Sequence, residues 1–188
     1  MALIIWDIDD VLNELSARWL EWVKDPVVTD KSQLTNPHFE EILGWNRGRY
    51  LESLDRFRAE RFIDLEPNRL VQSFMSHHTQ VSNVLLSATP LSCAPFSAQW
   101  GFVHFGQWID GVLIAPSPRP ETPSTNKTKR DHIQRLVDAG DRVICIDDQP
   151  ANIREAERAG ALAFLWPQPW NESESSQAAV LDSISNIL

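Results

Sequence analysis

The sequence predicts an α/β fold: a doubly wound, Rossmann-like parallel sheet with a small helical cap inserted after the first strand. Three observations predict it. Short runs of consecutive apolar residues stop at polar residues, as in strands that are buried on both faces. Helical patterns separate several of these runs. A helix-rich stretch, residues 14–79, lies between the first and second runs and is too long for one crossover helix.

Composition supports one domain with a modest insertion. The chain has 188 residues, of which 43% are hydrophobic, and a formal net charge of −9. That length and apolar content suit a packed core and argue against disorder. The acidic balance argues against nucleic acid as a partner, because nonspecific binding of nucleic acid rests on many Lys and Arg contacts with phosphates.

No membrane partner is expected either, because no apolar stretch approaches the roughly 20 residues that cross a bilayer. The two cysteines, Cys93 and Cys145, are too few for a disulfide framework. We therefore expect a cytoplasmic location. The oligomeric state is left open.

The expected elements follow from these runs. Strands are predicted at residues 2–6, 81–86, 111–115, 142–146 and 161–166. Helices are predicted at residues 132–140, ending at Gly140, and at residues 150–160, beginning with Pro150.

The inserted stretch contains three further helical patterns, at residues 15–23, 49–62 and 68–78, with a looplike segment at residues 25–38. Leu54 and Phe57 fall near helical spacing and are assigned to the core of the cap. The predicted division is therefore a core of residues 1–13 and 80–188 and a cap of residues 14–79.

Acidic side chains follow the first strand. Asp7 and Asp9 are two residues apart, so in an extended segment both carboxylates face one side. Crowded carboxylates raise one another's pKa unless a cation lies between them. Mg²⁺ suits this arrangement, because it prefers oxygen ligands and is often bound by one or two carboxylates with a substrate phosphate. An acidic turn is the simpler alternative.

The strand at residues 142–146 also ends at carboxylates, Asp147 and Asp148. Here the alternative is that Asp148 caps the following helix. Ser87 ends another strand, where a hydroxyl beside backbone N–H groups suits a phosphoryl oxygen. Lys127 or Lys129 precedes a helix and offers a cation beside its first N–H groups.

Taken in order, these motifs resemble the haloacid dehalogenase superfamily of aspartate-nucleophile phosphohydrolases. The segments that carry the resemblance are DIDDVLN (7–13), VLLSATP (84–90), NKTKRDHI (126–133) and VICIDDQPAN (143–152). The position of the cap, between the first and second motifs, also resembles that superfamily.

The resemblance implies a role for each residue. Asp7 is the nucleophile that forms an aspartyl-phosphate, and Asp9 is the general acid and base. Mg²⁺ is bound by Asp7, by the Asp9 backbone carbonyl and by an Asp of the last motif. The alignment gives direct binding to Asp148 and a supporting position to Asp147, with the reverse left open. Ser87 and Lys129 bind the phosphoryl group, and Ile133 favours Lys129 over Lys127.

Two positions depart from the family pattern: Asp10 stands where many members have Gly, and Asn152 where many have a second Asp. The cap segment 45–61 contains five arginines, of which one or two are expected to meet an anionic substrate. The expected function is a Mg²⁺-dependent phosphatase of a small phosphorylated metabolite. The alternatives are a phosphotransferase or phosphomutase, and a noncatalytic scaffold that binds phosphate and Mg²⁺.

Tryptophan is unusually frequent, with eight residues against one Tyr. Trp6 adjoins Asp7 and is interpreted as a wall of the site. Trp100 and Trp108 are interpreted as core residues or as part of a loop that stacks on a substrate ring.

Overall fold

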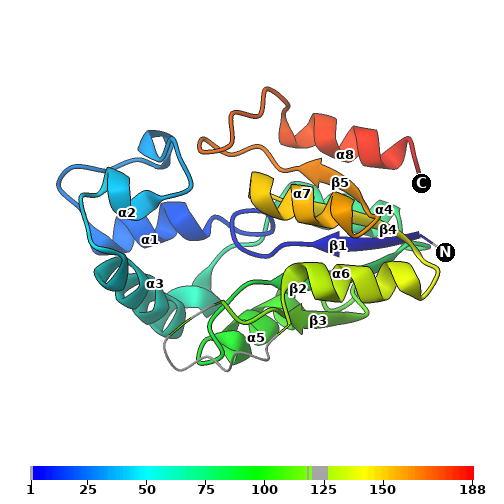
Figure 1. Cartoon of the computed structure of the whole chain (residues 1–188), viewed down its shortest axis with the longest axis horizontal. Coiled ribbons are helices and arrows are strands. Elements are labelled where there is room, and N and C mark those ends of the chain that lie inside the picture. Colours follow the sequence, from blue (N-terminus) through cyan, green and yellow to red (C-terminus); the bar gives the residue numbers. More distant parts are fainter. Residues whose placement is uncertain (1, 118, 120–126) are drawn as a thin grey trace.

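The predicted fold class is confirmed. The computed structural model describes residues 2–117, 119 and 127–188, and in these residues one parallel sheet has the strand order β3-β2-β1-β4-β5 (Figure 1). Its strands lie within one residue of the predicted bounds at each end: β1 Ala2–Trp6, β2 Ser82–Ser87, β3 Gly111–Ile114, β4 Arg142–Asp147 and β5 Leu162–Leu165.

The strand order places a ligand site beside β1. From this central strand the chain moves outward through β2 and β3, and then returns to the other side of β1 for β4 and β5. The order therefore reverses between β1 and β4, and ligands of such sheets bind beyond the carboxyl ends of the strands at this point. Trp6 is paired with Ile146, and the Asp7 N–H donates to the Ile146 carbonyl at 2.9 Å.

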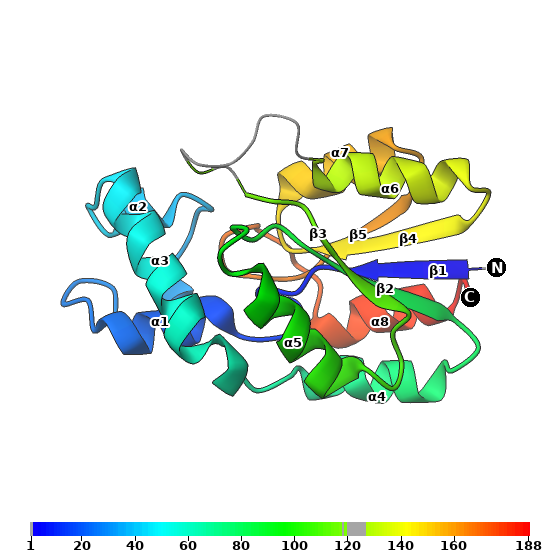
Figure 2. The ribbon, with the colours of Figure 1, turned by 90° about the horizontal axis from the view of Figure 1, so that it is seen from below.

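Helices cover both faces of the sheet (Figure 2). Leu3 and Ile5 of β1 pack in one apolar cluster with α6 and α7, whereas Ile4 and Trp6 pack in a second cluster with α4, α5 and α8. This alternation follows from the period of two in a strand. The helices are α1 Leu15–Val23, α2 Phe39–Ile42, α3 Arg47–Arg61, α4 Arg69–His77, α5 Ala94–Phe105, α6 Lys129–Asp138, α7 Pro150–Arg158 and α8 Gln177–Ser185.

The segment between β1 and β2 is helical, as predicted. Helices α1, α2 and α3 lie beyond the carboxyl ends of the strands, whereas α4 lies along the sheet beside α8 (Figures 1 and 2). The Phe74 ring of α4 meets the Trp6 ring edge-on, with ring centroids 5.7 Å apart. The division into a core and a cap stays a prediction, and α1–α3 are called the cap helices below.

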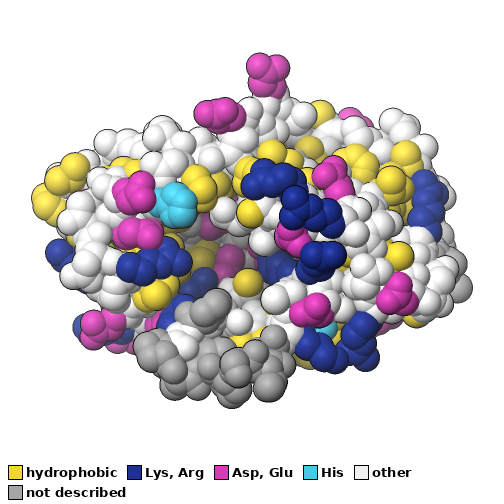
Figure 3. Space-filling model, viewed as in Figure 1, with side chains coloured by type: hydrophobic (Ala, Val, Ile, Leu, Met, Phe, Trp, Pro, Cys, Tyr) yellow, Lys and Arg dark blue, Asp and Glu magenta, His cyan; other side chains and the backbone are white. Residues whose placement is uncertain are grey.

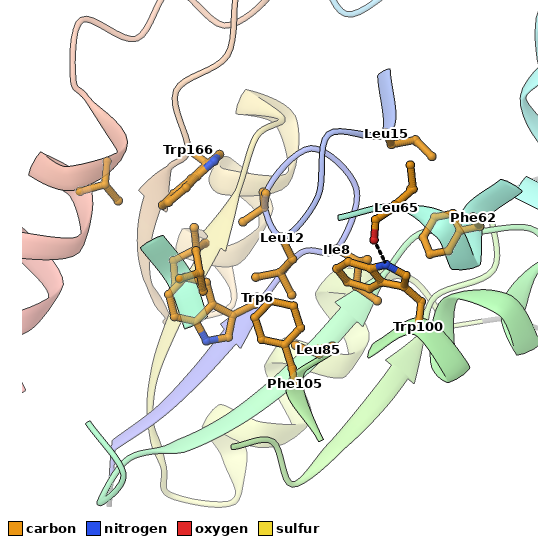
Figure 4. Close-up of a cluster of buried hydrophobic side chains, with 14 of the residues drawn as sticks. Trp6, Ile8, Leu12, Leu15, Phe62, Leu65, Leu85, Trp100, Phe105 and Trp166 are labelled. Atoms are coloured by element: carbon orange, nitrogen blue, oxygen red, sulfur yellow. Dashed lines mark hydrogen bonds between the residues drawn. The ribbon is translucent and has the colours of Figure 1, made fainter. Parts of the chain in front are cut away.

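The tryptophans mainly fill the interior. Trp6 is fully buried, and its indole N–H donates to the Asn83 side chain at 2.9 Å, so its interpretation as a wall of the site is wrong. Trp100 lies within α5, a helix that the sequence pattern did not predict, and its N–H donates to the Leu65 carbonyl at 2.7 Å (Figure 4). Among the described residues, no helix is long and apolar enough to cross a bilayer.

Candidate functional site

A lysine joins the ends of the two central strands. Asp7 follows β1, and Asp147 is the last residue of β4. The Lys129 ammonium lies 2.8 Å from Asp7 Oδ1 and 2.7 Å from Asp147 Oδ2, and all three side chains are at least 90% buried. Three motifs that are distant in the sequence are therefore in direct contact.

A capping box positions this lysine. The Asp131 N–H donates to Thr128 Oγ1, and Asp131 Oδ2 accepts a hydrogen bond from the Thr128 N–H. This pair satisfies donors at the start of α6 and makes Lys129 its first residue. Lys127 precedes Thr128, the N-cap residue of α6, and is exposed. Of the two lysines left open by the sequence, it is Lys129 that reaches the carboxylates.

A third carboxylate, that of Asp148, completes the cluster. One oxygen each of Asp7, Asp147 and Asp148 lies within 4.8 Å of the others. Asp148 Oδ2 accepts hydrogen bonds from Gln149 Nε2 and from the Trp170 indole N–H, each at 2.7 Å.

The electrostatics of this cluster suit a divalent cation. Burial raises the pKa of Asp7 to about 8, with Lys129 opposing the shift and Asp147 adding to it. Burial, followed by repulsion from Asp147, also raises the pKa of Asp148 well above its usual range. Three carboxylates and one ammonium would carry a net charge of −2 if all were ionised. The donor set therefore fits Mg²⁺, which prefers oxygen ligands and would balance that charge.

Asp147 and Asp148 differ in how their oxygens are used. Both oxygens of Asp147 accept from the Asn152 amide, at 2.9 and 3.0 Å, and Oδ1 also accepts from the Gln149 N–H at 2.9 Å. Where many family members have a second Asp, this chain therefore has Asn152, whose amide donates hydrogen bonds to Asp147. The hydrogen bonds that described residues donate to Asp148 all fall on Oδ2.

The Asp9 side chain lies apart from the three clustered carboxylates. Its Oδ2 lies 2.7 Å from Arg58 Nη2 of α3, while its Oδ1 is buried without a hydrogen-bond partner among the described residues. Arg58 is itself buried, unlike the exposed Arg47, Arg49, Arg56 and Arg61. The sequence grouped these five arginines, and the structure brings one of them to the site.

Ser87 ends β2 and is fully buried. Its Oγ has no hydrogen-bond partner within the part of the chain that the structure describes. The following residue, Ala88, lines the cavity that also contains Asp7 and Lys129. Ser87 thus lies immediately before a lining residue, with its hydroxyl unpaired.

This cavity measures about 160 Å³ and lies between the cap helices and the strand ends. Figure 3 shows the hollow between the two halves of the molecule, with acidic and basic side chains inside it. Its charged lining includes Asp7, Asp9, Arg58 and Lys129. Most of the apolar lining comes from the segment between β1 and β2, including Leu15, Trp19, Phe39, Tyr50 and Leu54.

Asp10 shapes the turn that leads from the site into the cap helices. It has a φ of 61°, in the left-handed region that Gly adopts most easily. Its carboxylate accepts from the Ser16 N–H at 3.0 Å and from the Ser16 hydroxyl, and lies 3.4 Å from the Lys31 ammonium. Burial raises the pKa of Asp10, and Lys31 opposes that shift.

Trp170 and Gln149 were not anticipated. Trp170 belongs to the segment WPQPWN (166–171), which follows the fifth strand. Because β5 is parallel to β4, this segment begins at the same edge of the sheet as Asp7 and Asp147. A run of aromatic and amide side chains at that edge was the available signal.

No protein-family model matches this chain, and no curated protein matches it. Solved structures do match. A haloacid dehalogenase-like protein from Agrobacterium tumefaciens is 14% identical with a TM-score of 0.67, over 100% of this chain and 97% of that one. A hydrolase from Streptococcus pneumoniae is 14% identical with a TM-score of 0.63, over 97% of each chain.

A haloacid dehalogenase-superfamily hydrolase of subfamily IA from Geobacter sulfurreducens also matches. It is 14% identical with a TM-score of 0.58, over 100% of this chain and 97% of that one. At these identities the likeness concerns the fold. The chain has the haloacid dehalogenase fold, as the sequence motifs indicated.

Proposed function

We propose that this chain is a Mg²⁺-dependent phosphatase that hydrolyses a small phosphate monoester through a phosphorylated Asp7. The observation that carries the proposal is the position of Lys129, whose ammonium bridges Asp7 and Asp147 at 2.8 and 2.7 Å. A buried cation beside a carboxylate nucleophile can stabilise the charge on the oxygens of a transferring phosphoryl group.

Mg²⁺ would be held by Asp7 and Asp148. Asp147 suits this role less, because its oxygens already accept from Lys129, Asn152 and the Gln149 N–H. The Asp9 backbone carbonyl is the third proposed ligand. Bound there, Mg²⁺ would supply positive charge beside the phosphoryl group.

The side chains of this chain would perform the proton and phosphoryl transfers. A carboxylate oxygen of Asp7 attacks phosphorus, and the bond to the leaving alcohol breaks. Asp9 would donate a proton to the leaving oxygen through Oδ1, which is buried without a partner among the described residues, while Oδ2 keeps its contact with Arg58. Asp9 then accepts a proton from the water that hydrolyses the acyl phosphate. Lys129 and the unpaired Ser87 hydroxyl bind the phosphoryl oxygens.

The cavity restricts the substrate. Its volume of about 160 Å³ is below the range of about 300–1,000 Å³ for drug-sized ligands, so the leaving group is small. Arg58 lines this cavity together with Tyr50 and Leu54, so it is the cap arginine that would meet the substrate. Its Nε is buried and lacks a partner among the described residues, which favours a substrate that offers it an acceptor oxygen.

A phosphate-release screen with Mg²⁺ tests the proposal, using sugar phosphates, nucleotides, phospho-amino acids, short phosphorylated acids and an aryl phosphate. Asp7→Asn should fold and lose at least about 10³-fold in kcat, as expected when a nucleophile is removed. Full activity of this variant would contradict the proposal.

Two other functions share this geometry. Transfer to an acceptor alcohol would use the same phosphorylated Asp7, and a structure from Thermotoga maritima with a TM-score of 0.61 and 15% identity is provisionally assigned as a β-phosphoglucomutase. Products formed with added alcohols separate transfer from hydrolysis. A noncatalytic scaffold would show no turnover, and beryllium fluoride, which with Mg²⁺ mimics a phosphorylated aspartate, would add no thermal shift to that of Mg²⁺ alone.

A further inference from the structure

One of the eight tryptophans contacts the carboxylate cluster directly. The Trp170 ring is 97% buried, and its N–H donates to Asp148 Oδ2 at 2.7 Å. The indole N–H groups of Trp6 and Trp100 instead donate to neutral acceptors in the core. A hydrogen bond to a carboxylate is stronger than one to a neutral acceptor, so Trp170 restrains Asp148.

The loop that carries Trp170 is itself anchored. Asn171 Nδ2 donates to the Asp148 carbonyl and to the Trp166 carbonyl, each at 2.7 Å. The Asn171 side chain therefore joins the end of β4 to the segment that follows β5. Asn171 thus anchors the loop that carries the indole to the core side of the site.

The same indole also meets residues from the segment between β1 and β2. The Phe39 ring of α2 packs edge-on against it, with centroids 5.0 Å apart. The Lys31 ammonium lies 5.4 Å from the ring centroid, within the range of a cation–π contact. Lys31 also pairs with Asp10, in the turn that leads into the cap helices. Figure 1 shows the loop between β5 and α8 extending toward α2.

Trp170 therefore connects two parts of the molecule. On one side are Phe39 and Lys31, whose positions depend on how the segment between β1 and β2 packs against the rest of the protein. On the other side is Asp148, where the indole and Gln149 both donate to Oδ2. With Oδ2 held by two donors, Oδ1 is the oxygen left for a cation.

We propose that Trp170 is a positioning residue. It couples the position of Lys31 and Phe39, in the segment between β1 and β2, to the orientation of Asp148 toward Mg²⁺. The inference rests on the proposed function, in which Asp148 binds that ion. Partners that orient a metal ligand commonly contribute a factor of about 10–100 in metal affinity.

The first test is Mg²⁺ affinity, measured by calorimetry without substrate. Trp170→Phe keeps an aromatic ring against Phe39 and removes the N–H donor. We expect it to weaken Mg²⁺ binding about 10-fold or more. In turnover, the Mg²⁺ concentration for half-maximal rate should rise, while kcat at saturating Mg²⁺ changes little. Trp100→Phe is the matched control, because it removes an equally buried N–H that donates at 2.7 Å away from the carboxylates.

The second test concerns Phe39 of helix α2. Phe39→Ala removes the ring that packs on the indole, and should weaken Mg²⁺ binding when Trp170 is present. In the Trp170→Phe background the same change should have little further effect, because no N–H remains to hold Asp148. Such non-additivity is the signature of two residues acting through one contact. Additive effects would overturn the coupling.

A spectroscopic readout separates coupling from general loss of packing. Mg²⁺ bound beside Trp170 should change tryptophan emission in the wild type and in Trp100→Phe, and the change should be absent in Trp170→Phe. If Trp170→Phe does not fold, Phe39→Ala alone still tests the proposal through Mg²⁺ affinity.

The outcomes are distinguishable. Equal Mg²⁺ affinity in the wild type, Trp170→Phe and Phe39→Ala would overturn this inference and leave the proposed phosphatase intact. A wild-type protein that binds no Mg²⁺ would overturn both the metal-dependent function and the role of Trp170.

Discussion

Arg58 Nη2 lies 2.7 Å from Asp9 Oδ2, so an ion pair joins helix α3 to the loop after the central strand. Arg58 Nη1 also lies 3.6 Å from Asp55 Oδ1, and Asp55 accepts two hydrogen bonds from Arg119, at 2.7 and 2.8 Å. Charged contacts therefore connect α3 to the segments that follow β1 and β3.

The Arg58–Asp9 pair should contribute to stability as well as to the site. In Arg58→Met, the carboxylate of Asp9 stays largely buried without its cation. Breaking a buried pair in this way costs about 3 kcal/mol in the free energy of unfolding. Arg56→Met is the matched control, because Arg56 is exposed on the same helix and solvent screens its pair with Glu60, so its loss should change the free energy of unfolding little. Urea denaturation of both variants measures the difference, and equal losses would contradict it.

The metal-free protein should become less stable as the pH rises. The pKa of Asp7 is raised from 3.8 to about 8 by burial, so the folded chain binds this proton more tightly than the unfolded chain. The contribution of Asp7 to the free energy of unfolding then falls as the pH increases from about 4 toward 8. Asp148 acts in the same direction. The pKa of Lys129 is raised by Asp147 and Asp7 despite its burial, so its charge is constant in this interval.

Thermal unfolding in EDTA at several pH values measures this slope. Asp7→Asn removes one titrating group and should make the slope shallower. Mg²⁺ competes with protons for the carboxylates, so the stabilisation by added Mg²⁺ should grow with pH. A pH dependence in EDTA that is the same in the wild type and in Asp7→Asn would contradict the assignment of a raised pKa to Asp7.

The two lysines near the start of α6 should differ sharply. Lys129→Met removes the ammonium that bridges Asp7 and Asp147, and should lower kcat at least about 10²-fold, as when one transition-state donor is removed. Lys127→Met changes an exposed side chain before the helix and should leave kcat within about twofold. Steady-state kinetics on any accepted phosphate ester decides between them. A larger loss in Lys127→Met would reverse the assignment.

The sheet was predictable because buried parallel strands appear in the sequence as uninterrupted apolar runs. The runs that end at Asp7 and Asp147 became β1 and β4, and the common direction of parallel strands brings their ends together. Lys129 was predictable from the family motif and from the apolar residue four positions later. The apolar runs, the lysine motif and the spacing of four residues are all short-range features of the sequence.

The contacts that cross the molecule were not predictable in the same way. Helical spacing places Arg58 on the buried face of α3, four residues after Leu54, and Arg56 on the exposed face, but it does not show that the buried face meets Asp9. Trp170 meets Asp148 across the β4–β5 connection, and Phe39 meets Trp170 across 131 positions of sequence. Helix α5 was missed because its sequence is apolar around most of its circumference and contains a glycine, Gly101, so it lacks a helical period.

Substitutions at Asp10 should separate backbone strain from side-chain hydrogen bonding. Asp10 has a φ of 61°, which costs a residue with a Cβ about 1–2 kcal/mol, although Asp tolerates it better than most. Its carboxylate repays this cost through Ser16 and Lys31. Asp10→Gly loses the hydrogen bonds and relieves the strain, so the net change in unfolding free energy should be about 1 kcal/mol or less.

Asp10→Ala loses the same hydrogen bonds and keeps the strain, and should therefore be less stable than Asp10→Gly by about 1 kcal/mol. Asp10→Asn should be the least affected, because Asn adopts this backbone region readily and keeps one acceptor oxygen for Ser16. Urea denaturation at one fixed Mg²⁺ concentration ranks the three variants. An Ala variant as stable as the Gly variant would show that this turn relaxes out of the left-handed region, and that Asp10 acts through its carboxylate alone.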